Sequence, residues 1–156
     1  MMQPRIRIAM FIISWLTVIF LPNKKQVFIK YLPVTLFSSM ILLGEIFLFS
    51  AYKLWKVKGK QKEMLHTALL LIFGPYLVLN IWFFYLSKGK FLLYALINFV
   101  ADLIYAFPVI SLFRKTNFFK INVKSYYFFL IILGDAIINY CFQKVFEKIY
   151  KPNKTD

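Results

Sequence analysis

Long apolar runs alternate with short basic connections along the whole chain. The runs contain no lysine or arginine, and they cover residues 8–21, 31–52, 65–86, 91–113 and 126–142. About 20 apolar residues make a helix that spans the ~30 Å hydrocarbon core of a bilayer. The pattern therefore predicts an all-α fold: a polytopic bundle of about five transmembrane helices, with no soluble domain, in one membrane domain over residues 1–156.

The starts of the first two runs carry additional information. Run 8–21 has only 14 residues, which make a helix of ~21 Å. Arg5 and Arg7 precede it, as basic residues do in a signal peptide, but no cleavage pattern of small residues follows. We expect a retained first helix, with Arg7 extending to the membrane interface. Pro33 is expected in the first turn of run 31–52, where a helix tolerates proline.

The third run contains a predicted helix break. Gly74 and Pro75 stand at the middle of run 65–86, and Pro75 lacks the N–H that would bond to the carbonyl of Leu71. We expect a kink here, with the Leu71 carbonyl available as an acceptor. Residues 87–90 (SKGK) then predict a tight turn into the fourth run.

Composition excludes several classes of protein. Hydrophobic residues make up 61% of the chain and aromatic residues 21%, whereas an average soluble domain is ~45–50% apolar. A soluble enzyme of this length could not bury so much apolar surface. Cys141 is the single cysteine, so an internal disulfide and a multi-cysteine metal site are both excluded.

Charge is concentrated between the runs. The 20 Lys and Arg against 6 Asp and Glu give a net charge of +14. In loops beside apolar runs, this charge indicates membrane topology and contact with anionic lipid head groups rather than nucleic acid. The bilayer contacts are expected from one lysine-rich connection: Lys53, Lys56, Lys58, Lys60 and Lys62. The densest internal connections favour a cytoplasmic N-terminus.

Three acidic residues lie inside the apolar runs, where each charge would cost at least ~2.5–3.5 kcal/mol. They are Glu45, Asp102 and Asp135. Their positions predict that three helices bring carboxyl groups together near the middle of the membrane. Asn98 is four residues before Asp102 and Asn139 is four residues after Asp135, so each amide shares a helix face with an acid and is expected to orient it. Such acids must be protonated, hydrogen-bonded together or bound to a cation.

These residues support two leading hypotheses. In the first, Glu45, Asp102 and Asp135 bind or move a proton or cation, and the break at Gly74 and Pro75 supplies backbone acceptors or a hinge. In the second, the same side chains only fasten helices in a structural or partner-binding membrane subunit, because hydrogen bonds between membrane helices are themselves stabilising.

A membrane-embedded enzyme is the third hypothesis. Asn98-x-x-x-Asp102 superficially resembles part of the aspartate-rich signature of membrane prenyltransferases, which hold a lipid diphosphate through Mg²⁺. The other acids of that signature are missing, and no Ser-His-Asp set, HExxH motif or phosphate-binding glycine loop is found. We expect no cofactor, no metal site and no catalytic residue, and we expect His66 to lie at the interface.

Scattered positions between about residues 10 and 110 carry a resemblance to a known family. They are Trp15, Leu21-Pro22, Glu45, Trp55, Gly74-Pro75, Trp82, Gly89-Lys90-Phe91, Asn98 with Asp102, and Phe107-Pro108. In these the chain resembles a family of small, uncharacterised multi-pass membrane proteins of Gram-positive bacteria. The resemblance implies a bacterial plasma membrane protein and brings no known activity.

Overall fold

A computed structural model describes most of the chain. It covers residues 4–52, 54–57, 61–115, 119–121 and 123–150. Within these residues the all-helical fold is confirmed. The helices are α1 (Pro4–Thr17), α2 (Lys24–Ala51), α3 (Gln61–Leu71), α4 (Leu77–Ser87), α5 (Phe91–Ile104), α6 (Ile110–Lys115) and α7 (Ser125–Tyr150).

Short irregular turns join some of these helices into longer rods. A 3₁₀ turn, η1 (Val18–Phe20), extends α1. A π-helical turn, η2 (Ile72–Tyr76), joins α3 to α4, and a second one, η3 (Tyr105–Val109), joins α5 to α6. The described residues thus form one helical rod for each apolar run.

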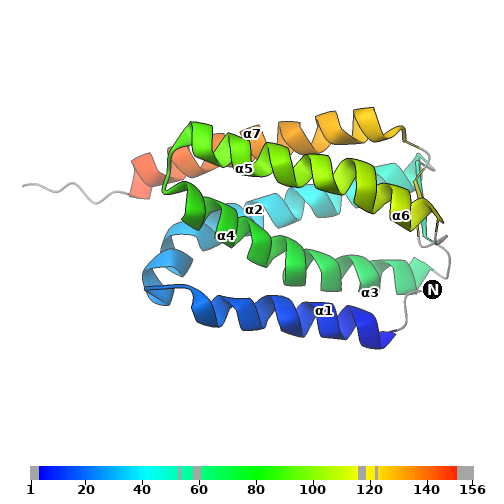
Figure 1. The fold of residues 1–156 in the computed structure, drawn as a ribbon, viewed down its shortest axis with the longest axis horizontal. Helices are drawn as coiled ribbons and strands as arrows, with labels where there is room; N and C mark the ends of the chain where they lie inside the picture. Colours follow the sequence, from blue (N-terminus) through cyan, green and yellow to red (C-terminus); the bar gives the residue numbers. More distant parts are fainter. Residues whose placement is uncertain (1–3, 53, 58–60, 116–118, 122, 151–156) are drawn as a thin grey trace, which may run out of the picture.

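The rods lie side by side along the length of the molecule (Figure 1). One end carries the start of α1, the end of α2 and the start of α7. The opposite end carries the α1–α2 connection, the α4–α5 turn and the end of α7. Two three-residue strands, β1 (Trp55–Val57) and β2 (Phe119–Ile121), pair antiparallel at the first end, with Lys56 opposite Lys120. We call the two ends the strand end and the turn end.

Two helices extend beyond the apolar runs. α2 begins at Lys24, so Pro33 lies well inside the helix and the expectation of a first-turn proline is wrong. α7 continues to Tyr150. A helix satisfies its own backbone hydrogen bonds, so it can run from lipid into the interface without a change of structure. The hydropathy of the sequence alone identifies only the apolar part of each helix.

The predicted break and the predicted turn are both present. Gly74 and Pro75 lie within η2, where a π-helical turn accommodates the missing N–H of proline. Pro108 has the same place in η3. Lys88 and Gly89 turn the chain from α4 to α5 with φ angles of 49° and 74°, a conformation that glycine adopts without strain.

Aromatic rings form the centre of the bundle near the turn end. Tyr31 stacks on Phe84 with ring centroids 5.7 Å apart, and Phe84 stacks on Tyr94 at 4.5 Å. Tyr140 of α7 contacts Tyr94 at 5.5 Å. The column connects α2, α4, α5 and α7. A smaller apolar cluster of Ile46, Ala68 and Ile72 lies towards the strand end.

The outside of the bundle is apolar. Leu92 is 81% exposed and Met40 is 72% exposed, and many other large apolar side chains point outward. Among the described residues, four helical rods are long and apolar enough to cross a membrane: Lys24–Ala51, Leu65–Ser87, Phe91–Leu112 and Ser125–Tyr150. The apolar part of the first rod, Arg7–Phe20, is shorter. A surface of this kind suits lipid rather than water.

Candidate functional site

Two of the three predicted acids meet between helices that are far apart in the sequence. The carboxyl groups of Glu45 on α2 and Asp135 on α7 lie within hydrogen-bonding reach of each other. Both side chains are half-buried. We call these residues the acid pair. No lysine or arginine shares the apolar runs that contain them, and the charged neighbour that acts on Glu45 is another acid, Asp135.

The third acid lies beside the acid pair. Asp102 on α5 is close enough to Asp135 for the two charges to interact. Its Oδ2 atom is buried and accepts no hydrogen bond from any residue that the structure describes. The structure therefore brings all three predicted acids into one region, with Asp135 between the other two.

A chain of hydroxyl and amide groups lies next to the acid pair. Ser38 on α2 is at its centre: Asn139 Nδ2 donates to Ser38 Oγ at 2.8 Å, and Ser38 Oγ lies 2.6 Å from the Tyr76 hydroxyl. Either hydroxyl can be the donor in the bond between Ser38 and Tyr76. Tyr76 is near both carboxyl groups of the acid pair. The chain thus joins α2, η2 and α7.

The contact between α2 and α7 is polar along much of its length. On α7 the polar residues recur every four positions, at Asp135, Asn139, Gln143 and Glu147, which places them on one face. On α2, Glu45 faces Asp135 and Ser38 faces Asn139. Lys30 of α2 faces both Gln143 and Glu147. We call this set of seven residues the polar seam.

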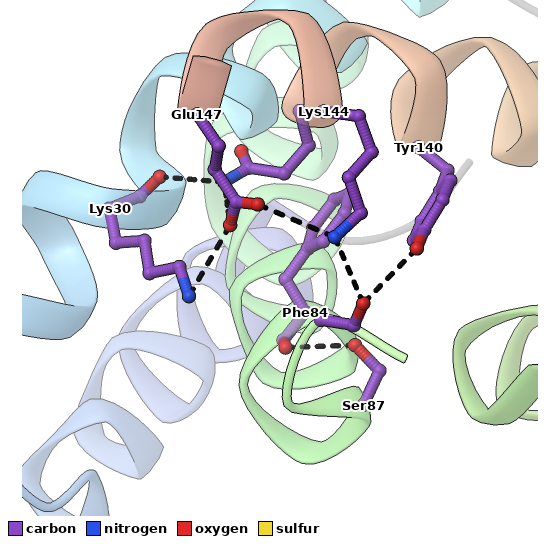
Figure 2. Close-up of polar contacts among 8 residues, drawn as sticks. Lys30, Phe84, Ser87, Tyr140, Lys144 and Glu147 are labelled. Atoms are coloured by element: carbon purple, nitrogen blue, oxygen red, sulfur yellow. Dashed lines mark hydrogen bonds and ion pairs between the residues drawn. The ribbon is translucent and has the colours of Figure 1, made fainter. Parts of the chain in front are cut away.

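The polar seam ends in an ion-paired network at the turn end (Figure 2). Glu147 lies 3.3 Å from Lys30 Nζ and 3.4 Å from Lys144 Nζ. Gln143 Nε2 donates to the Lys30 carbonyl at 3.2 Å and to Glu147 at 3.1 Å. The Gly89 carbonyl accepts from Lys144 Nζ and from the Tyr140 hydroxyl, both at 3.1 Å. The network holds α7 against both α2 and the α4–α5 turn.

Helix α1 packs on the π-helical turn from the other side. Trp15 Nε1 donates to the Phe73 carbonyl at 3.0 Å, and Trp15 stacks near Phe28. Trp15 therefore packs against other helices, as its place in the middle of run 8–21 predicts. Gly74 faces Phe11 so closely that a side chain would not fit between them. The break at Gly74 and Pro75 is thus held in place, and it positions Tyr76 beside the acid pair.

The predicted supporting amides have partners other than the acids. Asn98 Nδ2 donates to the Tyr94 carbonyl, one turn earlier on α5, at 2.9 Å. Asn139 donates to Ser38. Both amides are buried. Their helical spacing from the acids is as expected, but they connect helices or cap the backbone rather than orient a carboxyl group directly.

Sequence reasoning did not single out Tyr76 and Glu147. Tyr76 is one of ten tyrosines, and only its position after Pro75 sets it apart. Glu147 falls beyond run 126–142, where an acid among lysines is ordinary. Its four-residue spacing from Gln143 was the available signal. Lys53, Lys58 and Lys60 lie outside the described residues, so the expected lipid contact of that connection stays a prediction.

The arrangement of the acids bears on cation binding. Among the residues that the structure describes, no group of three or more His, Cys, Asp or Glu side chains is placed to hold a metal ion. Glu45 and Asp135 are in contact, and Asp102 is within electrostatic range but not in a common ligand cluster. This geometry suits a shared proton better than a multivalent cation, which takes several oxygen ligands at once.

No model of a known protein family, no curated protein and no solved structure matches this chain.

Proposed function

We propose that the chain is an integral membrane protein that binds and exchanges a proton at the acid pair of Glu45 and Asp135. The observation that carries the proposal is the contact between these two carboxyl groups, on different helices within apolar runs. Two carboxylates so close together repel each other, and an apolar environment strengthens the repulsion. One proton shared between them removes the repulsion and makes a hydrogen bond.

Asp102 and Tyr76 give the proton other groups to interact with. Asp102 has a buried oxygen that accepts no hydrogen bond from a described residue, and it lies near Asp135. Tyr76 connects to Ser38 and lies near the acid pair. A hydrogen-bonded group of carboxyl and hydroxyl side chains is typical of a proton relay in a membrane bundle. In this proposal Asp102 is the alternative proton acceptor.

The setting of the proposal is a bacterial plasma membrane, with the strand end cytoplasmic. The basic residues of Arg5, Arg7 and of the connections around β1 and β2 support this orientation, because cytoplasmic loops carry an excess of Lys and Arg. The lysines of the connections around β1 and β2 would contact anionic lipid head groups.

The experiment is infrared difference spectroscopy on the purified protein in lipid. Carbonyl stretches of protonated carboxyl groups should appear as the pH falls, and Glu45→Gln with Asp135→Asn should remove the component that belongs to the acid pair. Glu147→Gln is the matched control, because Glu147 is an acid of the same α2–α7 contact that is already ion-paired to lysine. Identical pH-dependent spectra for wild type and the double variant would refute the proposal.

Transport is tested separately, by proton flux into liposomes under a membrane potential. If the acid pair moves protons, the triple variant Glu45→Gln, Asp102→Asn, Asp135→Asn loses the flux. If wild type binds a proton but shows no flux, the acid pair is a fixed binding site.

A structural subunit is the second candidate function. The observation that favours it is the Asn139–Ser38–Tyr76 chain, which fastens three rods without any titratable carboxyl group. If the chain is a structural subunit, Glu45→Gln and Asp135→Asn keep full thermal stability. Neither the infrared carboxyl signal nor the proton flux then differs from wild type. The lipid diphosphate enzyme has weaker support, since the described residues offer no cluster of acids suited to Mg²⁺; calorimetry with a lipid diphosphate and Mg²⁺ tests it.

A further inference from the structure

The polar seam contains two buried oxygen atoms that accept no hydrogen bond from any described residue. They are Oδ1 of Asn139 and Oε1 of Gln143, and each side chain is only 3% exposed. Each residue uses its amide N–H group within the polar seam. A buried amide oxygen without a donor costs ~1–3 kcal/mol. Native proteins usually satisfy such atoms, and a bound water is the common solution when no side chain is near.

The spacing of the polar seam fits one water between successive residues. Asp135, Asn139 and Gln143 are each four residues apart, which is ~6 Å along a helix. Two hydrogen bonds of ~2.9 Å through a single water join polar atoms that lie up to ~5.8 Å apart. Gln143 then bonds directly to Glu147 at 3.1 Å. Water at both amide oxygens would complete a hydrogen-bonded line from the acid pair to the turn end.

Towards the strand end, the described residues next to the acid pair on α7 are apolar. Before Asp135, the residues of α7 on the same face are Ile131 and Phe128. The nearby cluster of Ile46, Ala68 and Ile72 is also apolar and buried. The polar seam therefore leads from the acid pair towards the turn end.

We infer that the polar seam is a hydrated path, with water bound at Asn139 and Gln143, that opens the acid pair to the aqueous phase at the turn end. For its role in proton exchange the inference rests on the proposed function, but the hydration itself can be measured without it. The path gives the acid pair access from the turn-end side of the membrane.

Thiol accessibility tests the path directly. In a Cys141→Ala background, Ser38→Cys puts a thiol in the polar seam, and Met40→Cys puts one on the lipid-facing side of the same helix. Thiols react with charged methanethiosulfonates as thiolates, which form only in contact with water. We expect Ser38→Cys in liposomes to react about tenfold faster than Met40→Cys, and only from the side on which Lys88→Cys reacts.

Adding Gln143→Leu to Ser38→Cys should slow that reaction by about tenfold, because leucine removes a polar partner of the water. Equal rates for the two cysteines, reaction from the strand end, or no effect of Gln143→Leu would overturn the inference.

A second measurement uses no cysteine and covers the case in which Ser38→Cys does not fold. The infrared carboxyl band of the acid pair is followed after transfer to D₂O in wild type, Gln143→Leu and the lipid-facing control Val145→Leu. Exchange should slow in Gln143→Leu alone. If the band exists and Gln143→Leu exchanges as fast as wild type, the hydrated path is wrong while the proton site stands. If the band is missing at every pH, the proposed function fails, and the thiol rates alone decide the path.

Discussion

Replacing Gly74 with alanine tests whether α1 packs directly on the π-helical turn η2. A Cβ atom at this position would stand 2.8 Å from Phe11 Cδ2, 3.1 Å from Phe11 Cα and 3.4 Å from Phe11 Cβ. The ring of Phe11 could rotate away. The Cα atom belongs to the backbone of α1, however, so the helix itself has to move.

The magnitude follows from the contacts that would change. Overpacking of a close contact costs ~1–3 kcal/mol. The nearby bond from Trp15 Nε1 to the Phe73 carbonyl, 3.0 Å long, would also be strained or lost, and a hydrogen bond of this kind contributes ~0.5–1.5 kcal/mol. Alanine in place of glycine stabilises a helix by up to ~1 kcal/mol, which offsets part of this loss. We therefore expect Gly74→Ala to lower the free energy of unfolding by about 1–3 kcal/mol.

The assay is thermal unfolding of the purified protein in detergent, followed by far-UV circular dichroism and by tryptophan fluorescence. Gly44→Ala and Gly134→Ala are matched controls, because nothing lies within 4 Å of an added Cβ at either position. Both controls should unfold at or above the wild-type temperature. Wild-type stability of Gly74→Ala, with unchanged tryptophan fluorescence, would refute the packing of α1 on η2.

Three further substitutions probe other contacts in the same unfolding assay. Ser38→Ala leaves the amide of Asn139 without its acceptor and should cost ~1–3 kcal/mol, whereas Ser39→Ala, which loses only a bond within α2, should cost less; equal losses would contradict a central role for Ser38. Glu147→Gln should lower the free energy of unfolding by no more than ~1 kcal/mol at low salt, because its lysine partners are partly exposed. The difference from wild type should shrink at high salt. A loss of stability that does not change with salt concentration would show that the ion pairs are not its cause. Trp82→Phe removes a 3.2 Å hydrogen bond to Thr17 and should cost ~0.5–1.5 kcal/mol, a reading that a stable variant would disprove.

Much of the fold could be predicted from the sequence because hydropathy and helix geometry act locally. The apolar runs predicted the rods, Gly74 and Pro75 predicted the break, and the SKGK segment predicted the turn. The extension of α7 to Tyr150 could not be predicted from hydropathy, because its last turns owe their position to Lys30 and the α4–α5 turn.

The site was predictable in part for the same reason. Asp135, Asn139 and Gln143 share a helix face by spacing alone, and their burial against α2 follows from the avoidance of lipid by polar groups. Which residue of α2 meets each of them depends on how the helices rotate and slide, which no local pattern fixes. Tyr76 reaches Ser38 only because η2 takes the form of a π-helical turn, and the sequence predicted no more than a break there.

The position of α7 has a consequence for the order in which the protein can be completed during synthesis. Glu45 and Ser38 are made about a hundred residues before the partners that cover them, Asp135 and Asn139. The turn at Gly89 likewise waits for Tyr140 and Lys144. The polar groups of the early helices therefore have to stay hydrated, or bind temporary partners, until α7 leaves the ribosome. A nascent chain that stops short of α7 would present a carboxyl group to lipid and be a substrate for quality control.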